Sequence, residues 1–355
     1  MPDFGIFRGF NEKLFGDKLV AGQLPTQLGL IGSEDITPIF GFVFTVDTTQ
    51  SGVSASDQFK LPLTTSTGLD AEVDWGDGTS DNITSHTAPE VTHTYPSSGT
   101  YTINITGDLL GWQFNNGGDK LKMGNVENWA GLNISVDTGF RGCTNLTATA
   151  TDAPTITSTS LLEYFRDCSN FNSEIGNWDV SNVTNMQSLF FRANLFNGDI
   201  SSWDTSQVTN MQSMFRSSTS HAFNRDISGW DVSNVQIFNN TFSGADSFNQ
   251  DISNWDTSSA YDMSYMFQNA DAFDQDISSW DINQVLYFTN FMQYATGLST
   301  TNYDALLVGW EAQAPTYSGA INFGGSQYTS GEAAEAARTS LINTYGWTIT
   351  DGGPA

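Results

Sequence analysis

The sequence predicts a mainly β protein: a β-sandwich, then a repeat solenoid, then an α/β cap. Three observations carry this prediction. A unit of Phe, Asp-Ile and Trp-Asp recurs, and its tryptophans are 25, 27, 25 and 25 residues apart, which is typical of stacked copies of one small coil. The stretch before the repeat alternates apolar and polar residues, and the last 55 residues lose the period. The repeating tryptophans are Trp178, Trp203, Trp230, Trp255 and Trp280.

The composition of the chain argues against several classes of function. The 355-residue chain has 12 Lys or Arg against 39 Asp or Glu, a net charge of -27, so we expect no nucleic-acid binding. No apolar run approaches the roughly 20 residues that cross a bilayer, so we expect no membrane insertion. Residues 1–19 mix Phe with charged side chains and do not look like a secretory signal. An exterior type of protein without an export signal suggests release by lysis, as for a virion component.

Residues 1–33 are predicted to be a separate docking arm. Several Phe residues lie among glycines there, and such exposed apolar side chains need a partner surface. The alternative is an arm that folds back on its own sandwich. The predicted docking residues are Phe4, Phe7, Arg8, Phe10, Lys13, Leu14, Phe15 and Lys18.

Residues 34–110 are predicted to form the β-sandwich. Residues 39–46 are rich in β-formers, and residues 72–75 lead into a tight Gly76-Asp77-Gly78 turn. Residues 100–105 alternate, which places Tyr101, Ile103 and Ile105 on one face of a strand.

Residues 111–300 are predicted to be the solenoid, and residues 301–355 its C-terminal cap. In the cap, residues 303–308 and the stretch from Ala333 to Leu341 look helical, and residues 346–350 read as a last strand. A cap is expected because an open solenoid end invites further strand pairing. A recurring Phe sets the phase of the coils: Phe140, Phe165, Phe190, Phe215, Phe242, Phe267 and Phe291.

Repetition turns each motif residue into a column along the solenoid. Two Asp columns are predicted to cap turn amides, and calcium bridging between coils is the alternative, so calcium is the one cofactor considered. An Asn column is predicted to bond the next coil, and the Trp column to form core unless it is an exposed platform for glycans. The first Asp column is Asp179, Asp204, Asp231, Asp256 and Asp281; the second, the candidate calcium site, is Asp199, Asp226, Asp251 and Asp276; the Asn column is Asn172, Asn197, Asn224 and Asn249.

Two further sets of residues recur with the period: four arginines, called the basic stripe, and two cysteines. Arg141, Arg166, Arg192 and Arg216 each follow a Phe and form a possible ligand face; solvated ion pairs with Asp are the alternative. Cys143 and Cys168 are one period apart, so they should lie about 4.8 Å apart on neighbouring coils. The two cysteines could be buried free thiols or form a disulfide, and free thiols are favoured.

Two parts of the sequence resemble known families. Residues 73–79 (VDWGDGT) with residues 93–101 (HTYPSSGTY) resemble PKD-type immunoglobulin-like domains, which implies a spacer or binding module. Residues 140–146, 165–171 and 178–186, with the tail at 345–353, resemble BspA-like leucine-rich-repeat surface proteins. Relatives on cell surfaces carry an export signal and an anchoring or secretion-sorting tail, and we expect neither in this chain. Residues 7–25 instead resemble the start of structural proteins from marine tailed phages.

These observations lead to one functional hypothesis. We expect a phage virion surface protein, present in several copies, that docks to other virion proteins through its arm and adheres to a host surface protein or glycan. A purely architectural part of head or tail is the alternative, and a glycan-cleaving spike a less favoured one. We expect no enzyme, because every acid pair obeys the repeat. The three histidines are His86, His93 and His221. His221 lies in the one longer step of the repeat, which is predicted to bulge outward as a loop, and neither His93 nor His221 has a visible nucleophile or metal partner.

Overall fold

The computed structural model describes residues 41–355. The chain divides into two units, Met1–Ile39 and Phe40–Ala355, and only the second is described. The predicted docking arm and its eight residues therefore lie outside the described residues. In residues 41–355 no helix is long and apolar enough to cross a bilayer.

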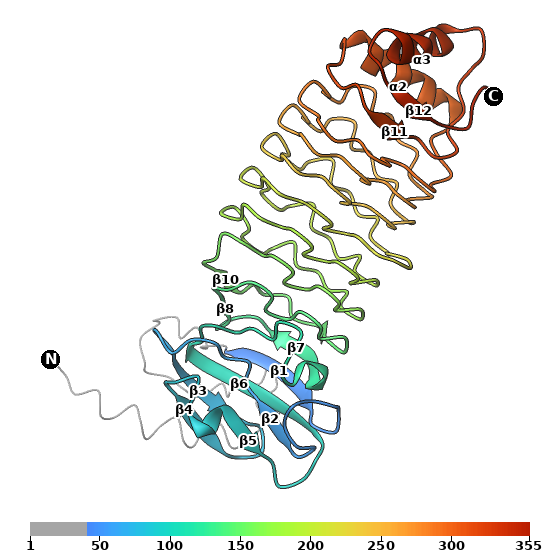
Figure 1. The fold of residues 1–355 in the computed structure, drawn as a ribbon. Helices are drawn as coiled ribbons and strands as arrows, with labels where there is room; N and C mark the ends of the chain where they lie inside the picture. Colours follow the sequence, from blue (N-terminus) through green and yellow to red (C-terminus); the bar gives the residue numbers. More distant parts are fainter. Residues whose placement is uncertain (1–40) are drawn as a thin grey trace, which may run out of the picture. The chain divides into compact units, whose positions relative to one another are not determined.

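The first part of this unit is a β-sandwich, as predicted, and the mainly β fold class is confirmed (Figure 1). The central strand β1 buries Phe42, Phe44 and Val46 and leaves the residues between them half-exposed, the alternation that a half-buried strand requires. Phe44 also meets Phe59 of the second sheet at a ring-centroid distance of 6.2 Å, which joins the two layers. The elements are β1 (Phe42–Asp47), β2 (Gln58–Lys60), β3 (Asp70–Asp74), β4 (Ser80–Ile83), η2 (Pro89–Val91), β5 (Thr92–Thr94) and β6 (Thr100–Asp108).

The sandwich sheet continues into the coils. Its strand order is β4-β3-β6-β1-β7-β9, so strands from beyond residue 110 extend the sheet past β1. Strand β7 pairs antiparallel with β1, and β9 pairs parallel with β7. The first coils are thus built on an edge of the sandwich, which leaves that edge paired. The added elements are η3 (Lys120–Lys122), β7 (Met123–Asn128), β8 (Asn133–Ile134), β9 (Thr147–Ala148) and β10 (Thr155–Ile156).

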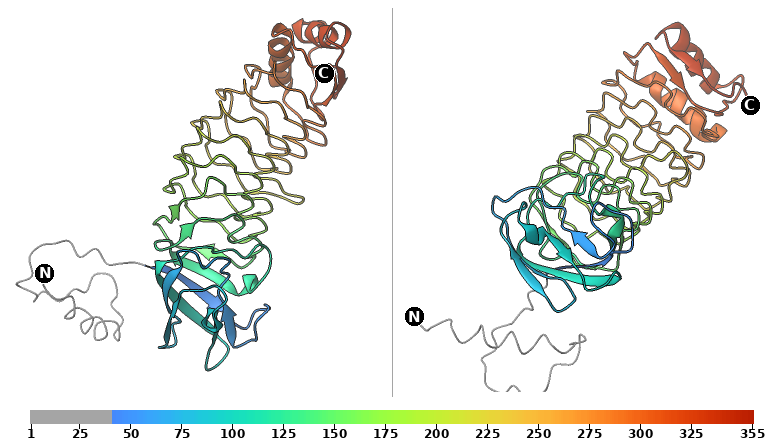
Figure 2. Two further views of the ribbon diagram at one scale, coloured as in Figure 1. Left: turned by 60° about the vertical axis from the view of Figure 1, so that its left-hand side comes forward. Right: turned by 60° about the horizontal axis from the view of Figure 1, so that its bottom comes forward.

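Beyond the sandwich, coils of about 25 residues stack along one axis (Figures 1 and 2). Parallel bridges join equivalent residues, so that Asn185 pairs with both Ser160 and Asn210. Inside, the phase phenylalanines stack face to face with ring centroids 5.6–5.9 Å apart from Phe140 to Phe267. A second column of five phenylalanines, Phe171 to Phe273, stacks beside it at 5.9–6.1 Å. The register that the period predicts is therefore present in the core.

Each coil turns at positions with left-handed backbone. The turn two residues before the phase Phe has positive φ in every coil from Thr138 to Asn290, and a second such position lies two residues after it in most coils. The left-handed region is costly for most residues and mild for Gly, Asn and Asp, which explains the small polar residues at many of these turns. Glu163, Arg192, Tyr265 and Tyr294 are exceptions, with φ of 55°, 56°, 60° and 67°.

The last coil departs from the predicted phase. The amide of Phe267 donates to Phe291 O, whereas the amide of Phe242 donates to Met266 O. In this pattern the residue after the accepting one is the equivalent of the donor. Phe267 is therefore the equivalent of Phe242, and Met292, not Phe291, continues the phase column in the last coil. Placing Phe291 in that column was wrong by one residue, and its ring meets Phe267 edge-on at 90°.

The C-terminal segment caps the stack with the predicted helices and strand. Trp310 of the first helix donates its Nε1–H to Ile277 O (3.1 Å), the bond that the repeat tryptophans make to their own neighbouring coils. Gln313 donates to Trp280 O (2.7 Å) and accepts from the amide of Ile282 (3.0 Å). The helix thus satisfies backbone groups of the last coil. The elements are α2 (Thr300–Ala312), β11 (Ala320–Asn322), α3 (Ala333–Asn343) and β12 (Thr348–Thr350), with β11 and β12 parallel.

The two cysteines are buried free thiols, as favoured, and not a disulfide. Ala193, Ala245 and Ala270 hold the same turn position in later coils, each with its amide bonded to the phase residue three before it. The position therefore takes a small buried residue. Burial raises the pKa of both Cys143 and Cys168, so both thiols stay protonated and unreactive near neutral pH.

His221 lies in the core, although its longer coil was predicted to bulge outward. Ser218, Thr219 and Ser220 are exposed, but His221 is completely buried. Its Nδ1 accepts the Phe223 amide (3.2 Å), and its Nε2 donates to Phe190 O (3.2 Å), so the ring is neutral with the proton on Nε2.

We expect acid to destabilise the protein through His221. Burial lowers the pKa of His221 from 6.5 to about 4. Between these values the unfolded state binds the extra proton, so stability falls with falling pH, by about 3 kcal/mol in full. Urea unfolding at pH 7.5 and 4.5 measures the loss. His221→Gln keeps a donor and an acceptor without this titration, and an equal loss in that variant would contradict the assignment.

Candidate functional site

The Asn and Trp columns serve the fold. The side-chain oxygen of Asn172 accepts the amide of Asn197 (2.8 Å), and the same bond repeats from Asn197 and Asn224 onward. The repeat tryptophans are at most 4% exposed. From Trp203 onward their Nε1–H groups donate to an isoleucine carbonyl of the preceding coil at 2.9–3.2 Å. The predicted structural roles are therefore confirmed, and the exposed tryptophan platform is wrong.

The Asp columns cap turns, as predicted. Each carboxylate accepts the amide two residues later, at 2.9 Å for Asp199, Asp226, Asp251 and Asp276 and at 2.9–3.1 Å in the column that follows Trp. The Ser201 amide lowers the pKa of Asp199, and the Ser228 amide does the same for Asp226. These bonds outweigh the repulsion between stacked carboxylates, which acts in the opposite direction.

The capping bonds bear on the calcium alternative. Within residues 41–355 no group of three or more Asp, Glu, His or Cys side chains is placed to hold a metal ion. Since serine amides already compensate the Asp columns, we expect a chelator to leave the melting temperature unchanged. A scanning-calorimetry trace with and without EDTA tests this; a drop that added Ca²⁺ reverses would restore calcium at Asp199, Asp226, Asp251 or Asp276.

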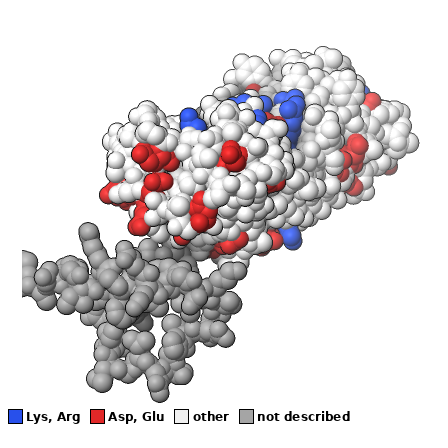
Figure 3. Space-filling model, turned by 90° about the horizontal axis from the view of Figure 1, so that it is seen from below, with Lys and Arg blue, Asp and Glu red and all other residues white. Residues whose placement is uncertain are grey.

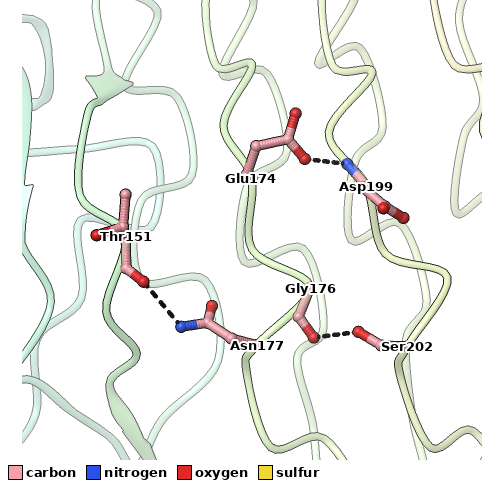
Figure 4. A pocket seen from close by; sticks show the side chains of 6 residues that line it. All are labelled: Thr151, Glu174, Gly176, Asn177, Asp199 and Ser202. Carbon is pink, nitrogen blue, oxygen red and sulfur yellow. Dashed lines mark hydrogen bonds between the residues drawn. The ribbon is translucent and has the colours of Figure 1, made fainter.

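A shallow hollow of about 310 Å³ lies across three coils near these columns (Figure 4). Its polar groups bond to one another: Glu174 accepts the Asp199 amide (2.6 Å), and Ser202 donates to Gly176 O (2.6 Å). Glu174 stands where later coils have Asp, so one acid does depart from the repeat. Its side chain is 66% exposed and is engaged in bonding the next coil. The polar groups of the hollow therefore join neighbouring turns of the coils, and we do not assign a binding site to it.

One face of the coils does not repeat its side chains. It carries the parallel bridges, whose positions hold Ser160, Asn185, Asn210, Ile237, Asp262 and Tyr287. The position after the phase residue is also varied, in the order Arg141, Arg166, Phe191, Arg216, Ser243, Gln268 and Gln293. The columns that hold the core and the outer turns keep one residue type. On the varied face Asn185, Asn210 and Asp262 still accept the amide two residues later, at 2.9–3.0 Å, and the other side chains differ from coil to coil.

The predicted basic stripe lies on this varied face, with a correction. The amide of Asp167 donates to Phe191 O and that of Arg192 to Arg216 O, so Phe191 is the equivalent of Arg166 and Arg216. Arg192 was wrongly placed in the column and lies one position later. Basic side chains seen from below gather mainly in one band (Figure 3).

Ion pairs hold the first half of the stripe. Glu163 accepts from Arg141 (2.6 Å) and from Arg166 of its own coil. Asp167 contacts Arg166 at 3.4 Å and Arg192 at 3.6 Å. These partly exposed pairs contribute little stability, as the alternative reading anticipated. In residues 41–355 Arg216 makes no ion pair.

The end of the varied face nearest the cap exposes larger side chains. Leu286 is 64% exposed, and Tyr294 is 72% exposed. Leu286 is held beside the coil before it by its amide, which donates to Tyr261 O (2.9 Å). Apolar and aromatic side chains therefore follow the arginines along the same face.

The sandwich holds a compact polar cluster at the turn singled out in the sequence. His93 contacts Asp77 through Nε2 (2.9 Å) and stacks on Trp75 with the ring centroids 4.6 Å apart. Trp75 is buried and donates to Asp81 (2.8 Å). The cluster ties the turn to strand β5 and gives His93 a structural partner.

The described part is thus a β-rich repeat protein with a sandwich at one end and a varied outward face. Residues 44–109 match the PKD domain family, and residues 133–222 and 218–306 each match a family described as "Mycoplasma protein of unknown function, DUF285". The PKD-type resemblance is confirmed, and the second match is compatible with BspA-like repeats. No curated protein and no solved structure matches.

Proposed function

We propose that this chain is a virion surface protein that adheres to host cells or their glycans through the varied face of its coils. The main support for this proposal is the contrast between positions that repeat along the coils and positions that vary. Positions that hold the core and turns repeat one residue type, whereas the bridge-bearing face changes from coil to coil. Side chains that the fold does not require are free for recognition, and rigid coils hold them in fixed register.

The virion location is supported by the resemblance of residues 7–25 to phage structural proteins, and the adhesive role by the PKD and repeat resemblances. Many weak contacts, multiplied by copies on one particle, give avidity without a deep pocket. The proposal is of a binding protein and not of an enzyme.

Two experiments test the proposal. A glycan array and host-cell binding assay with the full chain test adhesion; binding to neither would leave the architectural role as the better account. Particle incorporation of the full chain and of residues 34–355 tests docking. We expect the shorter chain to stay folded and to be lost from particles, and its retention would contradict the docking arm.

A further inference from the structure

The residue that lies between neighbouring arginines differs along the basic stripe. Between Arg141 and Arg166 the spacer is Glu163, which orders both guanidiniums and cancels charge. Between Arg166 and Arg216 the spacer is Phe191. The guanidinium carbons of Arg166, Arg192 and Arg216 lie 4.4, 5.1 and 5.7 Å from the centre of that ring. An aromatic ring attracts cations without neutralising them.

The cluster therefore keeps an excess of positive charge. Within residues 41–355 the ion pairs of Arg141, Arg166 and Arg192 are made with Glu163 and Asp167 alone. Four arginines against two carboxylates leave two positive charges. The chain as a whole carries -27. Four of its 12 basic residues are gathered here, on neighbouring coils, so the local charge opposes that of the molecule.

Arg192 also occupies a strained position. Its φ is 56°, in the left-handed region that equivalent positions fill with Gly142, Asp167, Gly244 and Asn269 and, in the last coil, with Tyr294. A left-handed backbone is unfavourable for a long side chain, and such outliers gather at functional sites. Its side chain is 48% exposed, and its contact with Asp167 is long, at 3.6 Å. The guanidinium is thus accessible and only weakly paired.

We propose that Arg192 and Arg216, ordered by Phe191, bind an oxyanion carried by a glycan. The chemical class is a carboxylate- or sulfate-bearing sugar in a chain of low charge density. Guanidinium groups bind such oxyanions through paired N–H donors. At 0.15 M salt the Debye length is about 8 Å, so a single ligand charge responds to the local arginines, whereas a dense polyanion meets the acidic surface around them. The inference rests on the proposed adhesive function and assigns its ligand.

The test uses the full chain and hyaluronan oligosaccharides, which carry a carboxylate on alternate sugars, with N-acetylated chitin oligosaccharides as the neutral probe. By titration calorimetry we expect the wild type to bind only the charged probe. Arg192→Ala combined with Arg216→Ala should weaken it by about tenfold or more. Phe191→Ala should weaken it while every charge remains. Arg225→Ala is the matched control, since Arg225 is 44% exposed and lies outside the stripe.

The outcomes separate this site from the adhesive function. A wild type that does not bind the charged probe, or a double variant that binds it like the control, overturns the site. If that double variant still adheres to host cells, adhesion stands without this site. If the site binds the probe and the wild type adheres to no host cell or glycan, adhesion fails and the site remains. Competition by inorganic sulfate at the same concentration as the sugar would show that the free ion, and not a glycan, is the ligand. Melting temperatures confirm that each variant is folded.

Discussion

Replacing Lys122 by Met should lower the free energy of unfolding by about 3–5 kcal/mol. The Lys122 side chain is completely buried. Its ammonium donates to the carbonyls of Ala55 and Gln58, each at 2.7 Å, and to the Ser54 hydroxyl at 2.9 Å. Without the ammonium these acceptors lose a charged donor, although Ala55 O keeps the Gln58 amide (3.0 Å) and Gln58 O keeps the Ser54 hydroxyl (3.1 Å).

Asp119 makes the loss larger. It is also completely buried and accepts the amides of Val53 (2.9 Å), Ser54 (3.0 Å) and Lys60 (2.8 Å). Its negative charge opposes the lowering of the Lys122 pKa that burial causes. The Met variant therefore leaves this carboxylate buried without its nearby cation.

Urea unfolding measures the effect, and Lys120→Met is the matched control. Lys120 is two residues away and only half-buried, and its ammonium bonds Asn116 at the surface. The control should lose less than about 1 kcal/mol. Equal losses in the two variants would show that the buried ammonium is not what joins the loop at residues 52–60 to the start of the coils.

Sequence reasoning succeeded where a residue type repeats. The Asn, Asp and Trp columns follow from the period alone, because residues one period apart must share an environment. The two cap helices followed from local pattern. What failed is what a period does not encode. Phe191 interrupts the arginine column, and only the backbone pairing shows that Arg192 belongs one position later.

Long-range polar contacts were equally out of reach. Nothing local indicates that Lys122 reaches a loop 64–68 residues earlier, because loop carbonyls carry no sequence signature. One missed feature did have a signal. Trp310 follows Trp280 by 30 residues, close to the repeat, and it continues the tryptophan column from within a helix. The change of secondary structure hid this equivalence.

The cap should fail locally when Trp310 is replaced. Its ring is completely buried, with its centroid 5.4 Å from that of Phe288 and 5.9 Å from that of Phe291. Its Nε1–H donates to Ile277 O. Trp310→Ala removes this packing and should cost about 3–5 kcal/mol. Trp310→Phe keeps most of the packing and removes one of the two donors to Ile277 O, which still accepts the Trp280 amide (3.2 Å), so this variant should lose only about 0.5–1.5 kcal/mol.

The position of the damage distinguishes a cap from an ordinary core residue. In a stack each coil contacts mainly its neighbours, so loss of the cap should open the last coils first. Hydrogen exchange should rise in residues 273–298 and stay slow in residues 140–170. Val308→Ala, on the same helix at a 40% exposed position, should change neither region. Uniformly faster exchange along the whole stack would mean that the coils unfold as one unit and that Trp310 does not act as their end plate.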